Sequence, residues 1–105
     1  MRIFIDPWVD EVIKSFYLRS MQLHPSLSEE SVVEKVNRLY DAIYNNLSSF
    51  PYKFSLAEHK EAWKKAGYRD FKTGNFHFAY QIYADENNVP FVVIWDACYD
   101  KLYHN

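Results

Sequence analysis

Apolar positions in the first half of the chain recur every three or four residues, which predicts two amphipathic helices. The first is expected over residues 7–23, with a stripe made of Val9, Val12, Ile13 and Phe16. Asp6 stands at its N-cap and Pro7 at its first position, both of which favour a helix start. Pro25 restricts His24 and ends the helix.

A second helix is expected over residues 27–48. Its stripe follows steps of four, three, four and four, through Val32, Val36, Leu39, Ile43 and Leu47. The segment from Ser26 to Glu29 fits a capping box, and Pro51 follows the expected end. Because only a short link separates the two helices, they are expected to form an antiparallel hairpin.

The second half of the chain changes to a period of two, which is typical of strands. Residues 75–84 alternate, and the positions expected to face the helices are Phe76, Phe78, Tyr80 and Ile82. A turn leads to a returning strand over residues 89–95, and residues 68–72 are a third strand of the meander. Residues 2–5 form a short strand, while residues 55–66 fit either a short helix or a loop.

Together these elements predict an α+β fold, an N-terminal helical hairpin packed on a small antiparallel β-sheet, in one domain over residues 1–105. The 49% of hydrophobic residues is enough for one core. No apolar run approaches the roughly 18 residues of a membrane span. No N-terminal secretory signal is evident, and Cys98 is the only cysteine. We therefore expect a cytoplasmic location and no membrane partner.

The charge balance argues against a protein that coats nucleic acid, because the net charge is −2. Basic residues nevertheless gather between residues 53 and 72, at Lys53, Lys60, Lys64, Lys65, Arg69 and Lys72. This stretch is either a solvated face or a patch that contacts phosphate. The four histidines share no helical spacing and no cysteine pair accompanies them, so neither a metal nor another cofactor is expected.

Two segments carry a resemblance to a known family. Residues 74–83 read GNFHFAYQIY, and residues 94–102 read IWDACYDKL. With the order of strand, helix pair and meander, they resemble the RelE/ParE superfamily, the toxins of bacterial type II toxin-antitoxin systems, often described as plasmid-stabilisation proteins. The resemblance implies a growth inhibitor that acts on translation or on DNA gyrase. It also implies a cognate antitoxin as partner, with the ribosome and its mRNA, or gyrase, as the target.

Two positions depart from the family pattern. His77 and Cys98 stand where the resembling toxins have arginines, which in the ribosome-dependent nuclease branch hold the scissile phosphate. Whether the chain is an enzyme is therefore left open. If it is a ribosome-dependent mRNA endoribonuclease, the residues available for catalysis are Arg69, Lys72, His77 and Tyr103. The alternative is a catalytically degenerate RelE/ParE-fold interaction domain without RNase activity.

Overall fold

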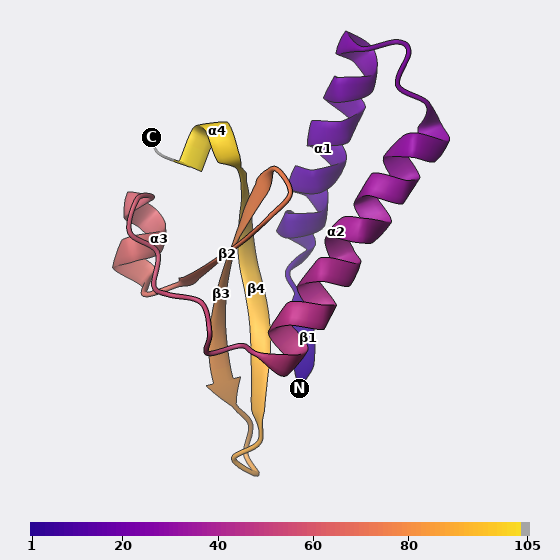
Figure 1. The fold of residues 1–105 in the computed structure, drawn as a ribbon. Helices are drawn as coiled ribbons and strands as arrows, with labels where there is room; N and C mark the ends of the chain where they lie inside the picture. The colour runs from indigo at the N-terminus through magenta and orange to yellow at the C-terminus, as the bar shows by residue number, and fades with distance from the viewer. Residues whose placement is uncertain (104–105) are drawn as a thin grey trace.

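The computed structural model describes residues 1–103, which contain four strands and four helices (Figure 1). In chain order they are β1 (Arg2–Ile5), α1 (Pro7–Leu23), α2 (Glu29–Ser49), α3 (Glu61–Ala66), β2 (Arg69–Thr73), β3 (Phe76–Ala84), β4 (Pro90–Tyr99) and α4 (Asp100–Tyr103). The α+β class is confirmed. Both long helices lie within two residues of their predicted bounds, and residues 55–66 include the short helix α3.

The four strands form one sheet in the order β1-β4-β3-β2. Strands β2, β3 and β4 pair antiparallel, as the meander predicts. Strand β1 pairs parallel to β4, so the sheet is mixed and the expectation of a wholly antiparallel sheet is wrong at this edge. A parallel pair requires a long crossover connection. Here the chain supplies it, since both long helices and the rest of the sheet separate β1 from β4.

The main core lies between the α1–α2 pair and one face of the sheet (Figure 1). The predicted inward positions of β3 are confirmed: Phe76, Phe78 and Tyr80 are buried in this core, and Ile82 packs against it. Val9 and Ile13 from α1 and Leu39, Ile43 and Leu47 from α2 meet them. A slip of one residue in β3 would turn these side chains to the other face, so burial fixes the register.

The start of α2 differs from the predicted capping box. Ser28 is the N-cap, and its hydroxyl accepts a hydrogen bond from the Ser31 amide at 3.1 Å. The preceding residues form a turn closed by the Leu27 amide, which donates to the His24 carbonyl at 2.9 Å. Because Ser26 lies within this turn, the N-cap of α2 is Ser28, two residues after the predicted position.

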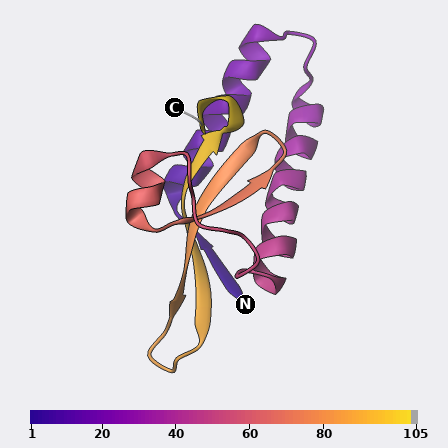
Figure 2. The same cartoon turned by 60° about the vertical axis from the view of Figure 1, so that its left-hand side comes forward.

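A second, smaller core covers the opposite face of the sheet, where α3 and α4 lie. Figures 1 and 2 both place the sheet between the long helices and α3. The buried residues of this smaller core are Ala57, Trp63, Ala79, Cys98 and Tyr103. The chain between α2 and α3 passes around the β2 edge to reach this face. The Ala57 amide donates to the Tyr68 carbonyl and the Asp70 amide to the Ser55 carbonyl, so this segment covers the edge.

The Asp96 carboxylate, on β4, joins elements from both faces. It accepts hydrogen bonds from the indole nitrogens of Trp8 on α1, at 2.9 Å, and Trp63 on α3, at 2.8 Å. It also accepts one from the Ala97 amide at 2.8 Å. The β3–β4 register shifts beside this residue, between Ala79 and Tyr80. Asp96 therefore fixes how α1 and α3 are placed relative to β4.

None of the helices in residues 1–103 is both long enough and apolar enough to cross a membrane.

We expect Asp96→Asn to lower the free energy of unfolding by about 2 kcal/mol, because an amide has one acceptor oxygen and leaves an indole N–H without a partner. Urea denaturation measures this loss. Asp41→Asn is the control, since it makes the same change at an exposed position of α2. An equal effect of the two substitutions would contradict the role given to Asp96.

Candidate functional site

Three of the four chemistry-bearing side chains predicted from the sequence, Lys72, His77 and Tyr103, lie together near the start of β3. His77 lies opposite Lys72 on β2 and opposite Cys98 on β4. It projects toward α4, on the face that carries the smaller core. Only 6% of His77 is exposed, and it is the one polar residue among the buried positions of the described chain.

Two carboxylates enclose the His77 ring, one at each nitrogen. Nδ1 lies 2.9 and 3.0 Å from the two carboxylate oxygens of Asp70, on β2. Nε2 lies 2.6 Å from Oδ1 of Asp100, the first residue of α4. A neutral imidazole has only one N–H. Both hydrogen bonds therefore require either a doubly protonated ring or a protonated carboxyl group.

The hydrogen bond from His77 is the main reason that the pKa of Asp100 is lowered. The nearby ammonium of Lys72, 3.6 Å from Oδ1 of Asp100, lowers it further. Partial burial acts in the opposite direction but is outweighed. The ionised form of Asp100 is thus the one that the folded chain favours, and it secures the start of α4 against β2 and β3.

Tyr103 covers the remaining face of the imidazole. The two rings stack with centroids 3.8 Å apart and planes 7° from parallel. Burial raises the pKa of Tyr103 to about 12, and its hydrogen bond with the Asp70 carboxylate contributes. The phenol therefore stays protonated at neutral pH, where it is a hydrogen-bond donor and not a base.

Arg69 does not join this cluster. It pairs with Tyr80 in the sheet, on the face of the main core. Its Nη1 donates to the Phe54 carbonyl at 2.6 Å and its guanidinium lies over the Tyr52 ring. Of the four residues predicted for catalysis, the structure thus brings together Lys72, His77 and Tyr103. It leaves Arg69 holding the segment that follows α2.

The arrangement around His77 is a closed ionic cage, which we define as Asp70, His77, Asp100 and Tyr103. Both ring nitrogens are engaged and the ring is almost fully covered, so no substrate atom reaches a free nitrogen. Cys98 beside it is buried, and burial raises the pKa of its thiol, which disfavours the thiolate. The cage is suited to hold α4 in place.

Sequence reasoning missed Asp70 and Asp100, the two residues that define the cage. The signal for Asp70 was the alternation of β2, which places it on the same face as Lys72, next to His77 across the strands. Asp100 carried a weaker signal. It comes into position because β4 continues to Tyr99, four residues beyond the predicted end, and α4 then turns back over the sheet.

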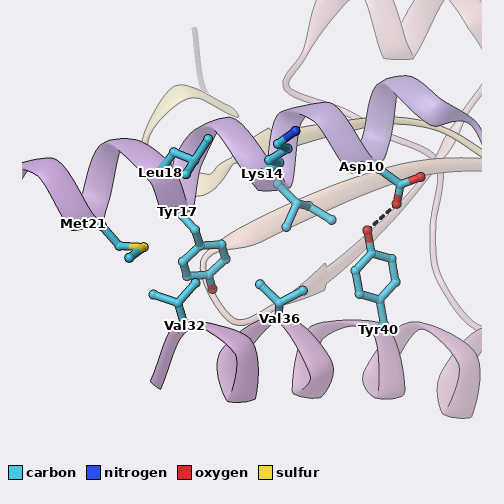
Figure 3. Close-up of a pocket in the computed structure, with 9 residues that line it drawn as sticks. Asp10, Lys14, Tyr17, Leu18, Met21, Val32, Val36 and Tyr40 are labelled. Atoms are coloured by element: carbon cyan, nitrogen blue, oxygen red, sulfur yellow. Dashed lines mark hydrogen bonds between the residues drawn. The ribbon is translucent and has the colours of Figure 1, made fainter. Parts of the chain in front are cut away.

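A separate hollow lies between α1 and α2 (Figure 3). Its volume is about 330 Å³ and its walls are mainly apolar, with Tyr17 and Met21 on α1 facing Val32 and Val36 on α2 and Leu18 at the rim. At one end the Tyr40 hydroxyl donates to Asp10. Burial and this carboxylate raise the pKa of Tyr40. The walls also include Lys14 and the Tyr17 phenol, but most of their area is apolar.

No cluster of metal-ligating side chains occurs in the described part of the chain. Comparison with known proteins adds no relative: no family model, no curated protein and no solved structure matches the chain.

The cage makes stability depend on pH in the acid range. Because the folded state lowers the pKa of Asp100, its contribution is present above the ordinary value of 3.8 and is lost as the pH falls through the folded-state pKa. We expect the free energy of unfolding of Asp100→Asn to fall less steeply than that of the wild type as the pH is lowered. Urea denaturation at a series of pH values measures this slope. Asp41→Asn is expected to keep the wild-type slope, and an unchanged slope in Asp100→Asn would contradict the cage.

Proposed function

We propose that the chain is a RelE/ParE-like growth inhibitor that acts by binding a macromolecular target and does not cleave RNA. The closed cage around His77 is the observation that supports the absence of RNA cleavage. A ribosome-dependent nuclease needs groups that reach the 2′-hydroxyl and the scissile phosphate. His77, the most reactive candidate, is 6% exposed and has a carboxylate at each nitrogen.

The charges near His77 also oppose a phosphate. Asp70 and Asp100 flank the ring, and the Lys72 ammonium already lies 3.6 Å from Asp100. A phosphate brought here would meet two carboxylates, and like charges repel. Arg69, the guanidinium that could grip a phosphate, lies on the other face of the sheet.

The proposed membership of the RelE/ParE superfamily rests on the order of elements and on the segment of residues 74–83. The structure has the strand, helix pair and three-strand meander on which the resemblance was based. Gly74, which opens the segment, has a φ of 57°, a conformation that glycine adopts without strain. In this proposal the target is DNA gyrase, the one that the resemblance links to inhibition by binding, and a cognate antitoxin neutralises the chain.

We expect induced expression in bacteria to arrest growth without codon-positioned mRNA cleavage, mapped by primer extension on ribosome-bound transcripts. Purified protein is expected to inhibit supercoiling by DNA gyrase. Lys72→Ala is expected to leave the arrest unchanged, as is the control Lys64→Ala on the exposed side of α3.

Three results would count against the proposal. Codon-positioned cleavage by the wild type would restore the nuclease assignment, and normal growth on full expression would remove the inhibitory role. Loss of arrest in Lys72→Ala alone, with the fold intact by circular dichroism, would return the cage surface to the functional site.

A further inference from the structure

The second half of α1, the end of β4 and α4 enclose a groove of about 540 Å³, lined by none of the residues of the α1–α2 hollow. Phe16 and Tyr99 form its floor, with ring centroids 4.6 Å apart. Leu23 and Leu102 line its mouth and are 63% and 56% exposed. Such large exposed leucines on either side of one groove indicate a surface that another molecule covers.

The groove carries positive charge although the chain as a whole carries net charge −2. Among residues 1–103, its ionisable lining residues are Arg19, His24 and Lys101, together with the Tyr99 phenol, and none carries a carboxylate. An adjoining hollow of about 420 Å³ shares Phe16, Ser20 and His24 with it and adds Lys35, again with no carboxylate among the described residues that line it. Within residues 1–103, neither Arg19 nor Lys101 forms an ion pair.

The cage explains why α4 presents this surface. Asp100 and Tyr103 point inward to His77, and the Asp100 amide donates to the Asn75 carbonyl at 2.7 Å. The two residues between them, Lys101 and Leu102, are consequently exposed. The groove is thus built on a fixed turn.

We propose that this groove, which we call the basic groove, docks an acidic amphipathic helix of a partner protein. Apolar side chains spaced three and four apart on such a helix would cover Leu23, Leu102 and the aromatic floor. Acidic side chains beside them would meet Arg19 and Lys101. A nucleic acid would satisfy the cations but leave both leucines exposed, so the combination favours a protein helix. This inference rests on the binding role proposed above.

The test uses a probe and not the cell, so that its result is independent of growth arrest. The probe is a synthetic peptide with leucines at helical spacing and glutamates between them, titrated into ¹⁵N-labelled full-length protein. We expect amide shifts confined to residues 16–24 and 99–102. Arg19→Glu, Lys101→Glu and Leu23→Ser are each expected to weaken binding, and Arg19→Glu with Lys101→Glu together by on the order of tenfold.

Matched variants outside the basic groove control for charge and for exposed leucine. Lys64→Glu on α3 and Leu18→Ser, which lines the α1–α2 hollow, are expected to bind the probe as the wild type does. Absence of binding up to about 1 mM probe, or shifts outside the groove, would overturn the proposal. Equal affinity for a peptide in which lysines replace the glutamates would also overturn it. So would a single-stranded RNA that binds more tightly than the probe and whose affinity is unchanged by Leu23→Ser.

Discussion

The hydrogen bonds of His77 to two carboxylates are the interaction on which the rest of this account depends. They join β2, β3 and α4 through one buried ring, and Tyr103 closes the remaining side. A buried polar group of this kind stabilises a fold only when its partners are complete, and no buried side-chain nitrogen or oxygen in the described chain is left without one. The same contacts that make His77 unavailable for catalysis position α4.

The two faces of the sheet consequently have different roles. The face under α1 and α2 is apolar and supplies most of the buried surface, with Phe76, Phe78 and Tyr80 at its centre. The opposite face holds a small core and the ionic cage. Asp96 connects them, because it accepts hydrogen bonds from indoles on α1 and α3. The buried polar contacts of Asp96 and His77 thus join α1, α3 and α4 to the sheet.

Sequence periodicity predicted the parts of the fold that depend on local patterns. The stripe of α2 and the alternation of β3 each repeat over enough residues to fix which side faces the core. The parallel pairing of β1 with β4 could not be predicted from the sequence, because a pattern of four residues indicates a strand but not which strand it pairs with. Asp70 and Asp100 are thirty positions apart and meet only through the sheet register and the turn into α4. Of the four predicted site residues, Arg69 lies apart from the other three: Arg69 and Lys72 are close in sequence, yet their odd spacing places them on opposite faces of β2.

Chemical modification of histidines tests the closed cage most directly. Diethyl pyrocarbonate reacts with accessible imidazole nitrogens, and His24 is an exposed internal standard within the same chain. Peptide mass spectrometry of the native protein is predicted to show His24 modified and His77 protected, with His77 becoming reactive only when urea unfolds the chain. Modification of His77 at the rate of His24 in the native protein would show that its ring is open to solvent, and would contradict the account.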